Sequence, residues 1–240
     1  MAGAVTKKTS AIAARPTRRA RAAAFQAYVL GASVAFVALA VAAHYVPYFG
    51  LDLRITKAVQ SLHVGVLDAV LRAFTWAGFV PQVDVIGTLL FLTLFLFGLR
   101  WEAVGVLFAY GITFVGIVVK LLVVRPRPSA DLVYVMSQLD STAFPSGHVL
   151  AATSVCGYLA FLAYTLLKPS ARRTALIGVA LAIVPLMGVS RIYLGQHWFS
   201  DVMGAYLLAS LWLALTIRFY RWGKPRFFRR QPVAPEAPGR

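Results

Sequence analysis

Twelve residues, Ser190 to Asp201, bring a cation, an imidazole and a carboxylate together in a chain that is poor in charge. Arg191, His197 and Asp201 carry these groups, and apolar runs lie on both sides. If residues 197–201 are helical, His197 and Asp201 are four apart and share one face. The carboxylate could then hold one ring nitrogen and leave the other free as a base or nucleophile. An ordinary capping pair would use the same two residues, so the rest of the chain must decide.

A second segment, residues 120–128, carries two cations. Lys120 and Arg127 lie seven positions apart, and the prolines on both sides of Arg127 favour extended backbone there. Flanking charge at the end of a membrane span is the ordinary explanation for such residues.

A third segment, Phe144 to His148, has the features of a helix start. Ser146 is a candidate N-cap, and Gly147 lets the backbone approach a ligand closely. Free N–H groups in the first turn attract an anion, and His148 would lie beside anything bound there. A plain capped helix would account for the same residues.

Phosphoryl transfer is the chemistry that suits these groups if they meet. His197 would attack phosphorus while Asp201 fixes the tautomer of its ring. His148 would give a proton to the leaving oxygen and later activate water. Cations and helix N–H groups match the oxygens of a phosphate and of its transition state. The cations are Lys120, Arg127 and Arg191.

The acids near these segments are too few for the carboxylate cluster of a magnesium or two-metal site. They are Asp131, Asp140 and Asp201. We therefore expect a metal-independent reaction without a cofactor. The single cysteine, Cys156, excludes a disulfide within the chain and a cysteine metal cluster.

The composition is that of a membrane protein. Of the 240 residues, 60% are hydrophobic and 13% are charged, against about 25% charged in ordinary soluble domains. The mean hydropathy is +0.74. The net charge is +16, but the basic residues lie between the apolar runs and at both ends. This pattern indicates membrane topology and no nucleic-acid partner.

Six apolar runs are long enough to cross a membrane, and we predict an all-α polytopic protein with six transmembrane helices. No run alternates with the period of a β-barrel. A proline, Pro185, should kink the fifth run. The runs are Ala27–Val46, Val83–Leu99, Ala103–Val124, Val149–Leu167, Ala175–Val189 and Val202–Ile217.

Three parts are expected along the chain: a basic tail (1–25), a membrane domain (26–221) and a basic, Pro-rich tail (222–240) predicted to be disordered. The first apolar run is predicted to be a retained span, because it is too long for a signal peptide and no convincing small-residue cleavage site follows it. The segment Leu51–Phe79 is predicted to form one or two amphipathic helices on the outer membrane face, although an ordinary packed loop helix would give the same pattern. Its apolar residues at helical spacing are Ile55, Val59, Leu62, Val66 and Val70.

The distribution of Lys and Arg gives the orientation. Most of the 24 fall in the two tails and in the connections on the same side, so both termini are predicted to be cytoplasmic. With six spans, all the candidate groups then converge at the opposite, outer face. Ionisable groups at that depth are costly enough to indicate function.

At these positions the chain resembles the type 2 phosphatidic acid phosphatase (PAP2) superfamily, which also contains the vanadium haloperoxidases. The three parts of its signature are Lys120-x6-Arg127-Pro128, Pro145-Ser146-Gly147-His148 and Ser190-Arg191-x5-His197-x3-Asp201. The resemblance covers roughly Ala27 to Ile217 and implies a six-helix membrane bundle with its site at the outer face.

The resemblance also carries roles over to this chain. It implies that His197 is the nucleophile, Asp201 its partner and His148 the acid and base. Pro128 and Ser190 match as positioning residues, and Arg125, outside the signature, is expected to be a surface cation near the mouth. The phosphate pocket would be Lys120, Arg127, Ser146, Gly147 and Arg191.

The expected substrate is a lipid phosphate or diphosphate whose tail stays among the membrane lipids. Members of the family act on phosphatidic acid, phosphatidylglycerol phosphate, undecaprenyl diphosphate and lipid A phosphates, all with the same signature. A lipid phosphotransferase and a non-catalytic lipid-binding or transport protein remain as alternatives. A bacterial plasma membrane is the expected location, and the oligomeric state is left open.

Overall fold

The computed structural model describes residues 17–62, 65–77, 82–139 and 141–227, and within these ranges every regular element is an α-helix. The prediction of an all-α fold is therefore confirmed. The helices are α1 (Arg18–Tyr45), α2 (Gly50–Gln60), α3 (Gly65–Ala77), α4 (Gln82–Leu96), α5 (Arg100–Tyr110), α6 (Ile112–Val123), α7 (Gly147–Leu166), α8 (Ala171–Tyr193) and α9 (Phe199–Phe227).

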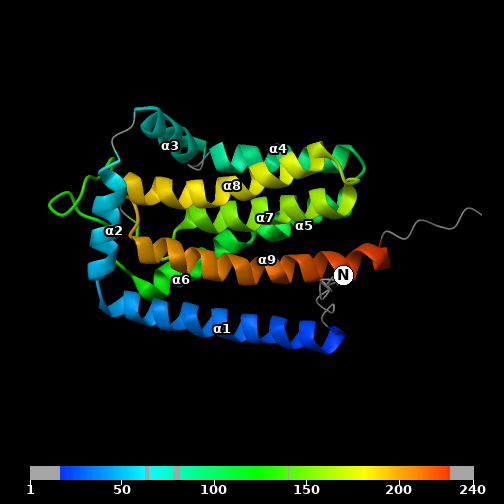
Figure 1. Ribbon diagram of the computed structural model, residues 1–240, viewed down its shortest axis with the longest axis horizontal. Coiled ribbons are helices and arrows are strands. Elements are labelled where there is room, and N and C mark those ends of the chain that lie inside the picture. Colours follow the sequence, from blue (N-terminus) through cyan, green and yellow to red (C-terminus); the bar gives the residue numbers. More distant parts are fainter. Residues whose placement is uncertain (1–16, 63–64, 78–81, 140, 228–240) are drawn as a thin grey trace, which may run out of the picture.

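The long helices run side by side along the long axis of the molecule (Figure 1). The central helix is α7, which packs against α5, α6, α8 and α9. At the edge of the bundle, α1 packs along α9 and α6. Helix α2 crosses one end of the bundle, next to the starts of α7 and α9 and the end of α8 (Figure 1).

Five stretches are long and apolar enough to span a membrane: Arg18–Tyr45, Arg100–Val123, Gly147–Leu166, Ala171–Tyr193 and Phe199–Phe227. The second predicted span corresponds to α4, which has 15 residues. At 1.5 Å per residue α4 is about 22 Å long, shorter than a hydrocarbon core of about 30 Å. The predicted count of six spans is therefore not confirmed, although α4 is an apolar helix at the predicted place.

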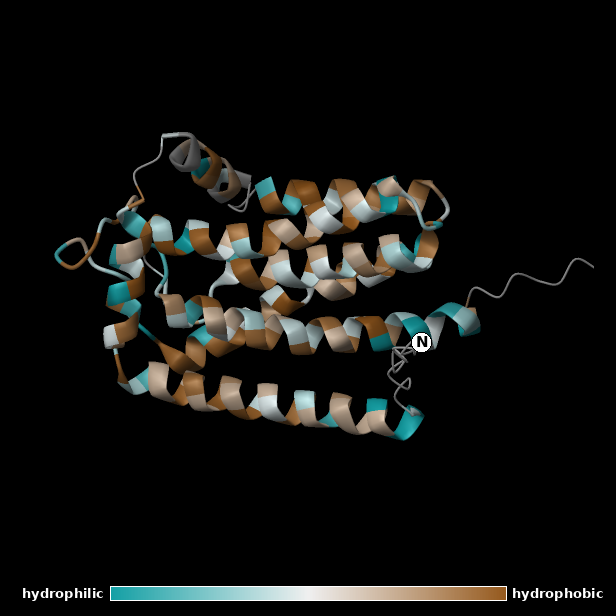
Figure 2. Ribbon diagram, viewed as in Figure 1, coloured by the Kyte–Doolittle hydropathy of each residue, from teal (hydrophilic) through white to brown (hydrophobic). Residues whose placement is uncertain are grey.

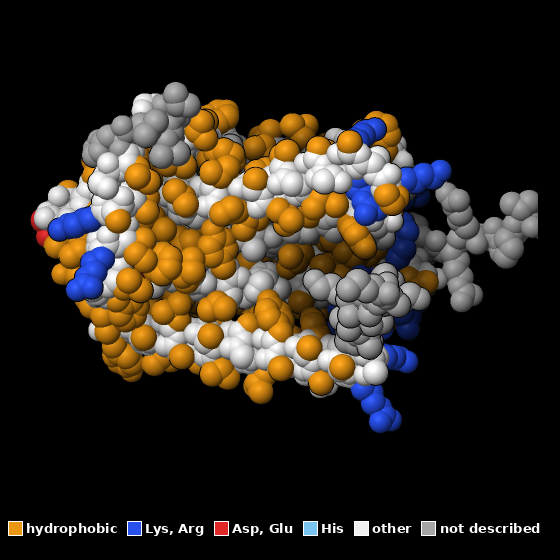
Figure 3. Space-filling view, viewed as in Figure 1, with side chains coloured by type: hydrophobic (Ala, Val, Ile, Leu, Met, Phe, Trp, Pro, Cys, Tyr) orange, Lys and Arg blue, Asp and Glu red, His pale blue; other side chains and the backbone are white. Residues whose placement is uncertain are grey.

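The outward surface of the bundle is apolar along its length. Leu96, Phe114 and Leu121 are 80%, 70% and 74% exposed. On the face shown in Figure 3, blue Lys and Arg side chains gather at the two ends and orange apolar side chains lie between them. The ribbon coloured by hydropathy shows the same division (Figure 2). Such a band is suited to lipid tails.

The segment between the first two spans forms two helices, α2 and α3, as predicted. Leu62 and Val70 are 51% and 38% exposed. Helix α2 ends at Gln60, so the apolar spacing does not continue along one axis. Among the side chains that the structure describes, the buried ones in this segment are Asp52 and Thr56 on α2 and Leu71 on α3. The place of these helices on the outer membrane face stays a prediction.

The ends of the membrane domain also differ from expectation. Helix α1 begins at Arg18, where the Thr17 hydroxyl accepts a hydrogen bond from the Ala20 N–H (3.2 Å), and α9 continues to Phe227. Both helices thus reach into the segments assigned to the tails. The remaining tail residues (1–16 and 228–240) and Asp140 lie outside the described residues. Pro185 lies inside α8, and the kink stays a prediction.

Candidate active site

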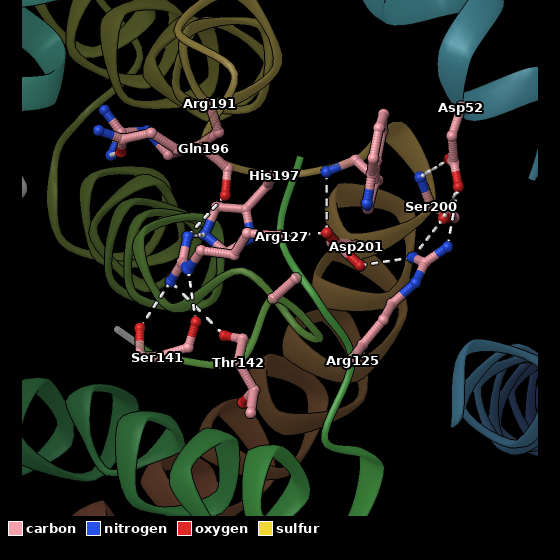
Figure 4. Close-up of polar contacts among 12 residues, drawn as sticks. Asp52, Arg125, Arg127, Ser141, Thr142, Arg191, Gln196, His197, Ser200 and Asp201 are labelled. Carbon is pink, nitrogen blue, oxygen red and sulfur yellow. Dashed lines mark hydrogen bonds and ion pairs between the residues drawn. The ribbon is translucent and has the colours of Figure 1, made fainter. Parts of the chain in front are cut away.

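The three segments singled out in the sequence meet at the end of the bundle that α2 crosses (Figures 1 and 4). Helix α6 ends at Val123, and the left-handed backbone of the next residue, Val124 (φ 47°), turns the chain into the connection that leads to α7. Close to it, α8 ends at Tyr193 and α9 begins at Phe199. The predicted convergence of the candidate residues is therefore seen in the fold, at one end of the bundle.

His197 lies in the short connection between α8 and α9 and is 3% exposed. Its Nε2 is 3.3 Å from Nη1 of Arg127. Its Nδ1 is 3.7 Å from Oδ2 of Asp201, which is an ion-pair distance but too long for a hydrogen bond. Among the described residues, Nδ1 has no hydrogen-bond partner. The ring thus has one nitrogen toward a cation and one toward a carboxylate.

Asp201 lies in the first turn of α9 and also caps that helix, because its Oδ2 accepts a hydrogen bond from the Trp198 N–H (2.8 Å). Asp201 therefore serves both as a helix cap and as the carboxylate beside the His197 ring, so the two interpretations of this pair are compatible. The helix begins after His197, but the four-residue spacing still places the carboxylate beside the imidazole.

The imidazole of His197 is held neutral. Burial lowers its pKa well below the usual 6.5, and the positive charges of Arg127, Lys120 and Arg191 lower the pKa further. A neutral ring keeps a lone pair on one nitrogen at physiological pH. That is the state in which histidine acts as a nucleophile.

Two of the three predicted cations are oriented by main-chain carbonyls. Lys120 Nζ donates to the carbonyl of Thr142 (2.6 Å). Arg127 donates from Nε to the carbonyl of Ser141 and from Nη1 to that of Gln196, both at 2.6 Å. The bonds of Arg127 fix its guanidinium beside His197 (Figure 4).

The third cation, Arg191, is buried at the end of α8. Its Nη1 donates to the side-chain carbonyl of Gln196 (2.7 Å), and the Gln196 amide donates to Ser137 Oγ (3.1 Å). Gln196 was not predicted. It contacts one arginine through its side chain and another through its carbonyl, so it links Arg191 to Arg127.

The predicted helix start is present at α7, with Ser146 at the N-cap position. The Ser146 hydroxyl makes no capping hydrogen bond, and among the described residues this buried oxygen has no partner. A methyl group added at Gly147 would meet nothing within 4 Å. His148 follows in the first turn. This start therefore leaves a buried hydroxyl and open space for a ligand, beside the first N–H groups of a helix.

The expectation for Arg125 was wrong. This arginine is fully buried, because two carboxylates and a carbonyl satisfy its guanidinium. It donates to Asp201 Oδ1 (2.6 Å), Asp52 Oδ2 (2.9 Å) and the carbonyl of Pro47 (3.1 Å). Sequence reasoning missed Asp52. The sequence signal that could have indicated a buried acidic partner was Arg125 itself. It is a second arginine two residues before Arg127, on the side where membrane topology does not require positive charge.

The connection between α6 and α7 is anchored to α2. Gln60 Nε2 donates to the carbonyls of Tyr134 (2.8 Å) and Tyr193 (3.0 Å), and Gln60 Oε1 accepts from the Tyr134 N–H (3.1 Å). A methyl group at Gly195, where φ is 63°, would lie 1.9 Å from the Tyr134 carbonyl oxygen. Glycine is thus required where the connection and the end of α8 approach most closely.

The fold and the site define a polytopic membrane protein with two histidines and several cations gathered at one end of its helical bundle. Residues 100–225 match the PAP2 superfamily. The chain is 31% identical over 183 residues to phosphatidylglycerophosphatase B of Bacillus subtilis (strain 168). The matched region covers 73% of this chain and 86% of that protein. Undecaprenyl-diphosphatase BcrC of the same organism is 30% identical over 179 residues, 70% of this chain and 84% of that protein.

A solved structure agrees with these matches. The crystal structure of a transmembrane PAP2-type phosphatidylglycerolphosphate phosphatase from Bacillus subtilis superposes with a TM-score of 0.71 and 26% identity, over 85% of this chain and 100% of that one. The chain belongs to the PAP2 superfamily. The predictions of a multi-pass membrane protein and of a hydrolase acting on lipid phosphates are confirmed.

Proposed function

We propose that the protein hydrolyses the phosphate or diphosphate of a membrane lipid through a phosphohistidine formed on His197. The observation that carries this proposal is a buried imidazole between Arg127 and Asp201, and burial and the nearby cations lower its pKa. The neutral ring offers a lone pair to phosphorus, and the cations around it suit the phosphoryl oxygens.

In the first step Nε2 of His197 attacks phosphorus. The P–N bond forms as the bond to the lipid oxygen breaks, and His148 gives that oxygen a proton. Asp201, beside Nδ1, offsets the positive charge that the ring gains. In the second step His148 takes a proton from water, the water oxygen bonds to phosphorus and the P–N bond breaks. The oxygens would be held by Lys120, Arg127, Ser146, Gly147 and Arg191.

The relatives favour two substrate classes. Phosphatidylglycerol phosphate is first, since both the most extensive sequence match reported above and the superposed crystal structure are named for that activity. An undecaprenyl diphosphate is second, on the match to undecaprenyl-diphosphatase. Phosphatidic acid is a third monophosphate of the same chemistry. A phosphotransferase would use the same residues and differ only in its acceptor.

The test of this proposal is phosphate release by the purified protein in detergent, with chelator present. The panel is phosphatidylglycerol phosphate, phosphatidic acid and undecaprenyl diphosphate. We expect phosphate release from at least one of these lipids, and the lipid that is hydrolysed fastest identifies the preferred substrate. Loss of activity in chelator with recovery in Mg²⁺ would refute the metal-independent mechanism. If no lipid releases phosphate, a labelled second lipid would report transfer in place of hydrolysis.

We further propose that the site faces the outside of a bacterial plasma membrane, with both termini in the cytoplasm. The connection from α7 to α8, which carries Lys168, and the first turn of α8, which carries Arg173, lie at the end of the bundle opposite the site, as do the start of α1 and the end of α9 with its own basic residues (Figure 1). The positive-inside rule then places the site outside.

A cysteine-labelling experiment tests this orientation. In a Cys156→Ser background, Gln138→Cys marks the connection at the site and Arg172→Cys marks the opposite end, since both side chains are exposed. We expect a membrane-impermeant maleimide to label Gln138→Cys in intact cells and Arg172→Cys only after lysis. The reverse pattern would invert the topology.

A further inference from the structure

Arg125 lies between two carboxylates that are far apart in the sequence, Asp52 on α2 and Asp201 on α9. Its Nη2 donates to Asp52 Oδ2 (2.9 Å) and its Nη1 to Asp201 Oδ1 (2.6 Å). The three side chains are at most 1% exposed. The guanidinium also stacks over the ring of Phe49, 5.0 Å from its centre. These contacts hold the Arg125 guanidinium in a single orientation.

Asp52 is equally fixed. Its Oδ1 accepts from the N–H of Ser200 (2.8 Å), and its Oδ2 accepts from the Ser200 hydroxyl (2.8 Å) and the N–H of Phe49 (3.0 Å). Figure 4 shows Asp52, Ser200, Arg125 and Asp201 as one continuous network. Helix α2 therefore holds the first turn of α9, in which Asp201 lies.

The network determines how Asp201 meets the imidazole. Arg125 occupies Oδ1, and the Trp198 N–H turns Oδ2 toward His197. Because Arg125 shares its charge with Asp52, Asp201 keeps more of its negative field at the ring. With a neutral residue at position 52, the whole positive charge would act on Asp201 alone. The imidazole would then lose part of the stabilisation it needs as the P–N bond forms.

We propose that Asp52 and Arg125 form a positioning pair that acts through Asp201 on the nucleophile His197. This inference rests on the phosphohistidine mechanism proposed above. It makes α2, a helix outside the three signature segments, part of the catalytic apparatus. The alternative is a structural tie that only fastens α2 to the bundle, since breaking a buried ion pair costs several kcal/mol of stability.

The kcat and KM of Asp52→Asn separate these possibilities. The substitution keeps the size of the side chain and removes its charge. We expect kcat to fall about 10- to 100-fold, which is the usual effect of losing a residue that orients a catalytic group without touching the substrate. KM should stay within about threefold, because the phosphate pocket is not touched. Asp131→Asn, the same change on an exposed side chain of the connection, is the control and should leave kcat within about twofold.

A second variant, Ser200→Ala, covers the case in which Asp52→Asn does not fold. The Ser200 hydroxyl bridges the pair, accepting from Arg125 Nη1 (2.7 Å) and donating to Asp52. Its loss keeps every charge and should lower kcat severalfold at unchanged KM. A folded variant of either kind with wild-type kcat overturns the positioning role, as does a rise in KM alone. A wild-type protein that releases no phosphate would contradict the proposed function instead.

Discussion

Replacing His197 by alanine is expected to lower kcat by about 10⁴-fold or more, because no other group near the phosphate pocket can take the place of the nucleophile. The measurement is phosphate release from the best lipid of the panel. The wild-type enzyme should also carry label from a ³²P-labelled substrate when it is quenched in base, where phosphohistidine survives. The variant should carry none.

The matched control is His44→Ala. This histidine ends α1, and its Nδ1 contacts the carbonyl of Val123 (3.0 Å), outside the phosphate pocket. We expect it to keep at least half of the wild-type kcat and all of the label. If His197→Ala retained appreciable turnover, or if the wild-type label were stable in acid and labile in base, the nucleophile would have to be sought elsewhere.

Replacing His148 by alanine is expected to slow phosphoenzyme formation much more with a lipid monophosphate than with a diphosphate. A lipid alcohol is a poor leaving group and needs a proton, so loss of a general acid should cost about 10²- to 10⁴-fold. When a lipid diphosphate is cleaved, the leaving group is a lipid phosphate, which departs as a stable anion and needs less help from an acid. With undecaprenyl diphosphate, we expect a loss of about tenfold at most.

The comparison must be made in a single turnover, since hydrolysis of the phosphohistidine is common to both substrates and would also slow without His148. The rate constant for appearance of the labelled enzyme isolates the first step. Equal losses on the two substrates would show that His148 does not protonate the leaving group. It would then remain a candidate only for activating water.

The groups that we propose contact phosphate could be singled out from the sequence because each lies in a short segment whose local pattern has a chemical meaning. The Ser146 and Gly147 pair indicates a helix start, and the four-residue spacing of His197 and Asp201 indicates a shared face. Counting apolar runs then placed the segments on one side. These inferences need only neighbours in the sequence and the number of crossings.

The residues that hold the candidate site residues in place, without contacting the substrate themselves, could not be predicted in this way. Asp52 and Arg125 are 73 residues apart, and Gln60 and Tyr134 are 74 apart. Their pairing depends on how α2 crosses the bundle, which local spacing does not reveal. The apolar residues of that segment suggested a face on the membrane, but they do not reveal that the buried face of α2 carries Asp52 and Thr56.

The carbonyls that hold the cations have a consequence for the release of the product. Lys120 and Arg127 donate to the carbonyls of Thr142, Ser141 and Gln196. Inorganic phosphate at the proposed pocket would compete with these acceptors, so part of its attraction to the cations is offset. We expect free phosphate to inhibit weakly, while a substrate adds the affinity of its lipid tail for the membrane.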